Sequence, residues 1–309
     1  MIIASAALIA LAVVANIFGA ARLAPLLTDG ALNSLYLALC LFAIWPGKST
    51  AAQRAPFQNR NFAHRGLYAQ NQTVPENSLP AFDAACAAGY GIELDVQFTS
   101  DKKLIVFHDD TLDRMTGVHG HVCDFAYAQV GGMSLGGTDR HPPLFTEVLG
   151  VVAGRAPLIV EIKSRRVFDG AYLDELCRAT LDALRAYRGA YCIESFDPRV
   201  VGRIRRMAPD VLRGQLADCA RSYHDEGANW VYSFTMSHCL GNLLGRPQFL
   251  AWCPSGRNRF VRWIYGLGAM RVYWTALPAD DQLALQQNND AVIFQWYRPA
   301  VSWQNGQNG

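Results

Sequence analysis

Short apolar runs separated by longer amphipathic segments fill most of the chain beyond residue 60. In the clearest run, residues 92–98, Ile92 and Leu94 alternate with Glu93 and Asp95. Side chains two positions apart share one face of a strand, so this pattern predicts a strand with both carboxylates on the same side. Two acids on one face repel each other and, if buried, need a cation between them or water around them.

The same alternation of strand and helix patterns continues along the chain. Strands are predicted at residues 61–63, 92–98, 104–108, 157–163, 191–195 and 211–216, and helices at 78–89, 169–187 and 198–207. Parallel strands with helical crossovers follow this rhythm, which favours the α/β class and a (β/α)8 TIM barrel. In such a barrel, functional residues gather at successive strand ends.

The carboxy-terminal part leaves the strand count open. Four further stretches have strand-like composition, more than a barrel needs: residues 230–234, 249–252, 272–275 and 291–294.

The first 47 residues have a different composition. Residues 1–21 are uncharged and almost wholly apolar, and as a helix they would span about 30 Å, the thickness of a bilayer core. The pattern predicts a retained membrane anchor, with a cleaved signal peptide ending near Gly19-Ala20-Ala21 as the alternative. We therefore predict a membrane-anchoring segment at 1–47, a linker at 48–58 and a catalytic domain at 59–309.

A second uncharged run, residues 31–45, would reach only about 22 Å as a helix. It suits a short second span, a re-entrant arm or an interfacial helix. Lys48, Arg54 and Arg60 follow it, and this basic excess predicts a cytoplasmic catalytic domain if both runs cross. If only the first run crosses, the topology can reverse. The remaining alternative is that both runs are buried helices of a soluble protein.

Composition narrows the class of partner. The formal net charge of the 309 residues is +2, and no basic-aromatic alternation surrounds the seven tryptophans, so nucleic acid is not expected. Eight cysteines without a Cys-x-x-Cys pair are typical of buried free thiols.

Seven short motifs occur in a fixed order, each at a predicted strand end or helix start. They are His64-Arg65-Gly66, Pro75-Glu76-Asn77-Ser78, Glu93-Leu94-Asp95-Val96, Phe107-His108-Asp109, Arg114-Met115-Thr116-Gly117, Glu161-Ile162-Lys163 and Ser195-Phe196-Asp197-Pro198. One triplet alone would be weak support, because short motifs recur by chance. Together the seven resemble the glycerophosphodiester phosphodiesterase family, which has the TIM-barrel fold.

The resemblance implies a set of site residues. Glu93, Asp95 and Glu161 would be the metal ligands; three oxygen donors suit one Mg²⁺ or Ca²⁺ ion better than zinc. His64 and His108 would be the general acid and base, for which an unperturbed pKa near 6.5 is suitable. Arg65 and Lys163 would bind the phosphate, and Glu76 would support the metal site or contact glycerol.

The implied reaction is hydrolysis of a glycerophosphodiester to sn-glycerol 3-phosphate and an alcohol. Either the glycerol 2-hydroxyl of the substrate or a metal-bound water would attack phosphorus. Which histidine donates its proton is not readable from the sequence. Taken singly, a histidine at a strand end is more often structural, and His119, His121 and His141 are predicted to be loop residues.

The chain departs from the family pattern near its end. An asparagine after Trp274-Thr275 and the last aspartate of the final strand motif are missing, and the chain instead reads Phe294-Gln295-Trp296-Tyr297. Since neither residue belongs to the metal triad or the histidine pair, the chemistry is expected to survive. The pocket for the alcohol group is where we expect a difference.

Two alternatives accompany this prediction. A lysophospholipase D-like or sphingomyelinase D-like enzyme would act on lysolipids at the membrane, which the amino-terminal segment and the altered final strand favour. A non-catalytic barrel that binds lipid headgroups would tolerate loss of a catalytic histidine.

Overall fold

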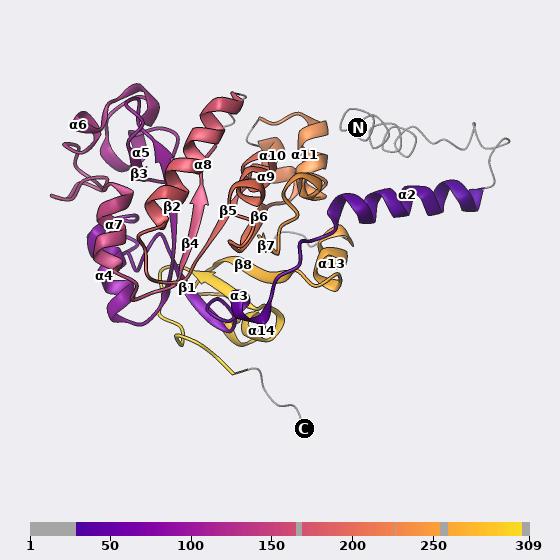
Figure 1. Cartoon of the computed structure of the whole chain (residues 1–309). Helices are drawn as coiled ribbons and strands as arrows, with labels where there is room; N and C mark the ends of the chain where they lie inside the picture. Colours follow the sequence, from indigo (N-terminus) through magenta and orange to yellow (C-terminus); the bar gives the residue numbers. More distant parts are fainter. Residues whose placement is uncertain (1–28, 165–168, 226, 254–258, 305–309) are drawn as a thin grey trace.

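A closed barrel of parallel strands forms the body of the protein (Figure 1). The computed structural model describes residues 29–164, 169–225, 227–253 and 259–304. The barrel strands are β1 (Arg60–His64), β2 (Gly91–Phe98), β4 (Leu158–Ile162), β5 (Tyr191–Ser195), β6 (Arg213–Ala217), β7 (Phe249–Trp252), β8 (Met270–Ala276) and β9 (Ala291–Phe294). Strand β1 pairs in parallel with both β9 and β2, which closes the ring. The predicted (β/α)8 barrel is confirmed.

One further strand lies outside the ring. Strand β3 (Leu104–Val106) pairs antiparallel with the end of β2, where Val96 lies opposite Val106. The chain between β3 and β4 forms an excursion with α5 (Asp113–Thr116), η3 (Val122–Asp124), α6 (Tyr127–Val130) and α7 (Phe145–Val152). This hairpin carries His108 to the same end of the barrel as the acidic residues of β2.

Helices surround the strands, except that most of α2 projects away from the barrel (Figure 1). Beyond the excursion they are α2 (Asp29–Ile44), α3 (Ala51–Arg54), α4 (Leu79–Ala87), α8 (Gly170–Leu184), α9 (Pro198–Met207), α10 (Ala220–Asp225), α11 (Trp230–Ser237), α12 (Asn242–Gly245), α13 (Arg259–Gly266) and α14 (Gln282–Asn288). The structure confirms where two predicted helices begin. The Ser78 side chain caps α4, which has a proline in its first turn, and the Asp197 side chain caps α9.

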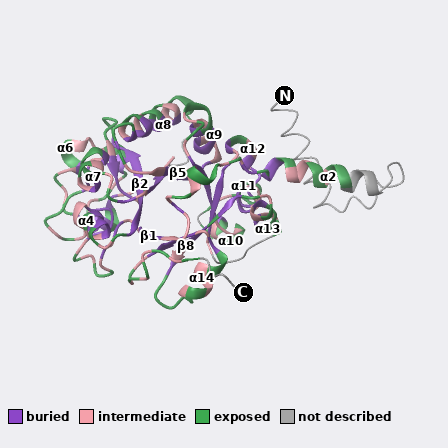
Figure 2. Cartoon of the chain, turned by 60° about the horizontal axis from the view of Figure 1, so that its bottom comes forward, coloured by how far each residue is buried: buried purple, intermediate pink, exposed green. Residues whose placement is uncertain are grey.

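The two faces of each strand meet different surroundings. Ile92, Leu94 and Val96 of β2 pack outward in the main core with α4 and α8. Inside the barrel, a second apolar cluster that includes Phe62, Ile159 and Phe249 fills the space between the strands. Buried residues accordingly concentrate on the strands (Figure 2). Because these apolar residues lie in the earlier parts of β1, β4 and β7, the inward polar side chains gather at the carboxyl ends.

One of the four strand-like stretches near the carboxyl terminus was predicted wrongly. Residues 230–234 lie in helix α11, which begins after Asn229, whose side chain accepts a hydrogen bond from the Tyr232 N–H. The aromatic and β-branched residues there favour a strand, but the cap determines the local structure. Its removal leaves nine predicted strands, which are the eight of the barrel and residues 104–108, where β3 lies outside the ring.

The predicted membrane location is contradicted for the part of the chain that the structure describes. Helix α2 has 16 residues, which gives a length near 24 Å, short of a bilayer core. No described helix is long and apolar enough to cross a membrane. The first apolar run, residues 1–21, lies outside the described residues. The prediction that an anchored catalytic domain faces the cytoplasm is therefore not supported either.

Instead, the end of α2 packs on the barrel. Ala43 and Ile44 are buried against α13 residues such as Ile264, and Arg246 stacks over the Phe42 ring at 4.7 Å. Arg246 also donates a hydrogen bond to the Trp45 carbonyl at 3.0 Å. The division into residues 1–47, 48–58 and 59–309 stays a prediction.

Candidate active site

Three carboxylates from two neighbouring strands converge inside the barrel. The parallel register sets Asp95 of β2 beside Glu161 of β4, and Glu93 beside His64 of β1. Glu93, Asp95 and Glu161 are all buried, and their potential ligand oxygens lie within 4.8 Å of one another. Carboxylates with this spacing fit a divalent cation that prefers oxygen ligands. The structure thus brings together the triad predicted from the sequence.

Two basic side chains balance part of this negative charge. Lys163 Nζ lies 2.8 Å from Glu161 Oε2 and 3.0 Å from Asp95 Oδ1, and Arg65 Nε lies 3.6 Å from Asp95 Oδ2. The Lys163–Asp95 contact is an ion pair without hydrogen-bond geometry, so Asp95 Oδ1 keeps its lone pairs for a cation. The predicted phosphate-binding cations therefore lie directly at the acidic cluster.

The three carboxyl groups differ in protonation. Burial, reinforced by the charge of Asp95, raises the pKa of Glu93 well above its usual range and that of Glu161 to about 7. Burial also opposes ionisation of Asp95, but the charges of Lys163 and other nearby groups outweigh it and hold its pKa well below normal. A cation that binds here must therefore displace protons from the two glutamates.

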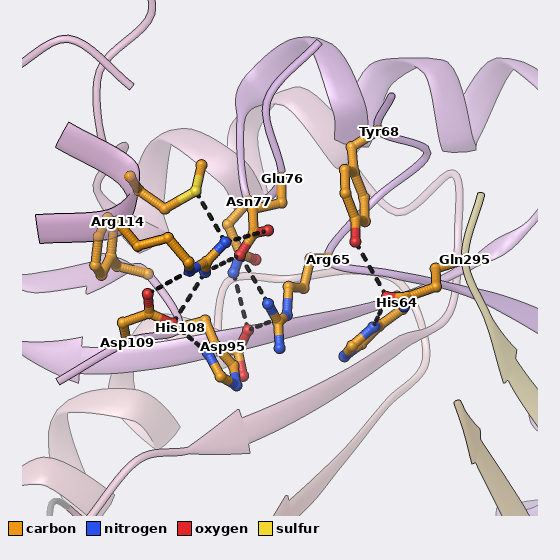
Figure 3. Close-up of polar contacts among 12 residues, drawn as sticks. His64, Arg65, Tyr68, Glu76, Asn77, Asp95, His108, Asp109, Arg114 and Gln295 are labelled. Carbon is orange, nitrogen blue, oxygen red and sulfur yellow. Dashed lines mark hydrogen bonds and ion pairs between the residues drawn. The ribbon is translucent and has the colours of Figure 1, made fainter. Parts of the chain in front are cut away.

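His64, at the end of β1, lies between the acidic cluster and the last barrel strand. Its Nε2 is 3.8 Å from Glu93 Oε2, and its Nδ1 is 2.7 Å from Gln295 Oε1 (Figure 3). The same Gln295 oxygen accepts a hydrogen bond from the Tyr68 hydroxyl at 3.1 Å. Since an amide oxygen only accepts, we assign the proton to Nδ1, which leaves the Nε2 lone pair facing the site. Burial, followed by the charge of Arg65, lowers the pKa of His64 well below normal.

His108 is held by a different kind of partner. Its Nδ1 lies 2.6 Å from Asp109 Oδ1, and Arg114 Nε donates to Asp109 Oδ2 at 2.6 Å (Figure 3). Gln97 of β2 fixes the backbone of this segment by donating to the Phe107 and Asp109 carbonyls at 2.7 and 2.9 Å. Burial, followed by the charge of Lys163, lowers the pKa of His108, while Asp109 opposes the shift.

Glu76 is fully engaged by two arginines. Its Oε1 accepts from Arg65 Nη1 and Arg114 Nη2, each at 2.7 Å, and its Oε2 accepts from Arg114 Nη1 at 3.0 Å (Figure 3). It is 4% exposed. Of the two roles predicted for Glu76, this geometry matches support of the site, because both carboxylate oxygens already bind arginines.

The turn after β1 aims Arg65 at the acidic residues. The Arg65 backbone N–H donates to Glu93 Oε2 at 3.1 Å, and its φ of 55° is left-handed. Gly66 follows with φ of 83°, where a Cβ would come within 2.9 Å of the Ala81 backbone. Only glycine fits this close approach, which explains the Arg-Gly order.

Four residues at the site were not predicted as functional. Asp109 and Gln295 hold the two histidines, and Asn77 Nδ2 donates to Asp95 Oδ2 at 2.8 Å. Glu194 of β5 lies beside Glu161 in register, buried, with Oε2 lacking a hydrogen-bond partner among the described residues. Burial, then the charge of Glu161, raises the pKa of Glu194 well above normal. Its inward direction could have been found from the strand pattern, because Glu194 alternates with Ile193, which packs in the outer core.

A cavity of about 270 Å³ opens beside His64. It lies between the loop after β1 and the segment after β9, so Gln295 lines it while also contacting His64. Its walls are residues 66–70, residue 74 and residues 294–298. The altered Gln295-Trp296-Tyr297 sequence therefore forms part of a pocket, as expected from the sequence.

Comparison with known proteins gives one consistent family. The family model described as "Glycerophosphoryl diester phosphodiesterase family" matches residues 64–295. A glycerophosphodiester phosphodiesterase of Caldanaerobacter subterraneus is 34% identical over 210 residues, which cover 65% of this chain and 83% of the relative. Glycerophosphodiester phosphodiesterase 1 of Rattus norvegicus is 39% identical over 103 residues, 32% of this chain and 30% of the relative.

Solved structures share the fold. A putative glycerophosphoryl diester phosphodiesterase from Silicibacter pomeroyi aligns with a TM-score of 0.62 at 24% identity, covering 82% of this chain and 93% of that one. A phosphodiesterase from Oleispira antarctica, solved with sn-glycerol-3-phosphate, aligns with a TM-score of 0.61 at 22% identity, covering 78% and 94%.

Proposed function

Since the chain belongs to the glycerophosphoryl diester phosphodiesterase family, we propose that it hydrolyses glycerophosphodiesters at the cluster of Glu93, Asp95 and Glu161. It is a phosphoric diester hydrolase, as its relatives are. The products would be sn-glycerol 3-phosphate and an alcohol; the former was bound in the Oleispira antarctica structure, which supports this product.

The buried triad is the observation that carries the proposal. The three carboxylates offer ligand oxygens within 4.8 Å of one another, and Asp95 offers one that makes no hydrogen bond within the described residues. Glu93, Asp95 and Glu161 would hold one Mg²⁺ or Ca²⁺ ion. When bound, the ion would neutralise charge on the phosphoryl oxygens.

His64 and His108 would transfer the protons. A phosphodiester needs a base for its nucleophile and an acid for its leaving oxygen. Each ring has Nδ1 occupied, by Gln295 for His64 and by Asp109 for His108, so each would exchange protons through Nε2. The partners fix ring orientation and tautomer, as a second group does for a catalytic imidazole.

Arg65 and Lys163 would bind the phosphate from the two sides of Asp95. Both are half-buried beside the carboxylates, and Arg65 Nε makes no hydrogen bond within the described residues. Glu76 would act indirectly, because it and Arg114 fix the Arg65 guanidinium. Guanidinium groups held in this way suit bidentate contacts with phosphate oxygens.

Neither alternative drawn from the sequence gains support. The named relatives are glycerophosphodiester phosphodiesterases, which favours glycerophosphodiesters over lysolipids. Compared with a binding barrel, an enzyme better accounts for two imidazoles that each have a fixed Nδ1 partner.

The test is turnover by the full chain on a panel of glycerophosphodiesters with Mg²⁺, Ca²⁺ or a chelator. We expect metal-dependent release of glycerol 3-phosphate, reduced at least about a hundredfold by His64→Ala, His108→Ala and Glu93→Gln. His141→Ala, a loop histidine that we place outside the site, is the matched control and should retain activity. Turnover that survives the chelator or all three substitutions would refute the assignment.

A further inference from the structure

The cavity beside His64 is an unassigned binding site next to the reaction centre. One wall comes from Tyr68 after β1 and the other from Trp296 after β9; their rings meet edge to face, with centroids 6.5 Å apart. Tyr68 is buried, whereas Trp296 is 39% exposed. The cavity thus has an aromatic interior that opens to solvent at Trp296, Gln70 and Arg298.

Hydrogen bonds connect this cavity to the site. The Tyr68 hydroxyl, on the cavity wall, donates to Gln295 Oε1, which also contacts His64 Nδ1 (Figure 3). His64 Nε2 faces Glu93 on the opposite side of the ring. A group attached to the phosphate and extending past His64 would therefore enter the cavity.

The charges around the cavity decide what it can bind. Arg298 lines the cavity and forms no ion pair with a described acidic residue, and no described lining residue is acidic. Two acids act on the lining tyrosines from outside, Glu76 on Tyr68 and Asp280 on Tyr297. Glu76 is neutralised by Arg65 and Arg114, whereas Asp280 keeps its charge but does not line the cavity. A cationic ligand would meet Arg298 with no carboxylate among the described lining residues to offset it.

Aromatic walls alone could bind a quaternary ammonium through cation–π contacts, but the unpaired arginine opposes this. The polar side chains on the cavity wall favour a ligand with hydroxyl groups instead. Gln70 lines the cavity, and no hydrogen bond from Gln295 Nε2 occurs among the described residues. We propose that the cavity binds the leaving alcohol of the substrate and selects an uncharged, hydroxyl-rich alcohol of headgroup size over a cationic one.

The size of the cavity agrees with a small alcohol. At about 270 Å³ it is at the lower end of ligand pockets, which suits a headgroup rather than an acyl chain. The leaving alcohol is assigned here instead of the glycerol phosphate because residues 294–298 depart from the family pattern. The group that varies among glycerophosphodiesters is the alcohol. This inference rests on the proposed function.

The charge argument can be tested with three substrates on the full chain. They are glycerophosphoglycerol, glycerophosphocholine, and the analogue of the latter in which a quaternary carbon replaces the nitrogen. We expect kcat/KM to fall in the order glycerol, carbon analogue, choline. Arg298→Glu should raise kcat/KM for the choline diester about fivefold or more relative to its carbon analogue, and added salt should reduce this gain. An unchanged ratio, or a wild-type preference for choline, would overturn the charge selection.

Trp296→Ala tests whether the leaving alcohol binds in this cavity. Loss of this wall should bring the three kcat/KM values within about threefold of one another while turnover of glycerophosphocholine persists, because the phosphate site is untouched. Trp230→Ala, which removes an exposed tryptophan from α11, should leave the order unchanged. An equal loss on all three substrates would place the shared glycerol phosphate in the cavity and contradict the proposal.

A binding measurement separates this inference from the proposed function. Saturation-transfer NMR with a chelator present should detect glycerophosphoglycerol bound to the wild type and a weaker signal for Trp296→Ala. If binding depends on Trp296 but no diester is cleaved with metal, the pocket stands and the proposed function fails. If diesters are cleaved but neither binding nor selectivity depends on Trp296, the enzyme stands and the pocket assignment is wrong.

Discussion

At the residue scale, the site is a set of pairs in which one side chain fixes another. His64 is oriented by Gln295, and His108 by Asp109. Arg65 is oriented by Glu76, which is in turn held by Arg114. The five residues that we propose carry the chemistry were identifiable as candidates from the sequence because each lies in a short contiguous motif. Gln295 was not, because its partner His64 is 231 positions away along the chain.

Replacement of Gln295 should therefore reduce catalysis, although Gln295 contacts His64 and not the metal site. Gln295→Leu removes the acceptor for His64 Nδ1–H, so the ring loses its tautomer and orientation, and kcat should fall about 10- to 100-fold. Gln295→Glu retains an acceptor oxygen and should lose much less. Equal activity of the leucine variant and the wild type in steady-state assays would show that the contact has no catalytic role.

Protonation of the triad should make metal affinity depend on pH. The pKa of Glu161 is raised to about 7 and that of Glu93 well above normal, so in the metal-free protein both hold protons that the unfolded chain would release above pH 4.5. The stability of the metal-free protein should accordingly decline as pH rises from about 4.5 to 7, because the folded state binds more protons.

A bound divalent cation should reverse this dependence of stability on pH, because the cation binds the ionised carboxylates. Its affinity should increase as pH rises through about 7, with protons released on binding. Calorimetric titration in two buffers of different ionisation enthalpy measures that release. Equal affinity at pH values well below and well above 7, without proton release, would contradict the protonation states described for Glu93 and Glu161.

At the element scale, strands and helices with strong periodicity were predicted correctly, and one short segment was not. The alternation in β2 and the caps of α4 and α9 are local signals that survive in the structure. In α11, aromatic residues that favour strands follow the polar cap residue Asn229, and the segment is helical because of this cap. Composition measures how residues pack on average, while a cap satisfies particular backbone N–H groups.

The Asn229 cap of α11 should contribute measurably to stability. Asn229→Ala removes the acceptor for the Tyr232 N–H, bonded at 2.9 Å, and should lower the free energy of unfolding by about 1 kcal/mol. Asn229→Asp keeps the acceptor and should cost only a small part of that. Urea unfolding of the two variants and the wild type measures the difference. A wild-type midpoint for the alanine variant would show that tertiary packing alone holds α11.

At the scale of the whole molecule, the barrel explains why residues from four distant segments meet. The register of β1, β2 and β4 aligns His64, Glu93, Asp95 and Glu161, and the β3 hairpin adds His108. The strand rhythm predicted this architecture. It could not predict how α2 packs, because an apolar helix suits a membrane and a protein surface equally in sequence. Nor could it show the cavity, which requires the β1 and β9 loops to be adjacent through barrel closure.

The proposed reaction depends most directly on one divalent ion held by Glu93, Asp95 and Glu161. Electron paramagnetic resonance of Mn²⁺ titrated into the full chain counts such sites, with Glu161→Gln as the test variant and Glu147→Gln, an exposed glutamate of α7, as the matched control. We predict one tight site per chain in the wild type and control, weakened about a hundredfold in Glu161→Gln. A tight site that persists in Glu161→Gln, or no tight site in the wild type, would contradict the assignment of the metal to this cluster.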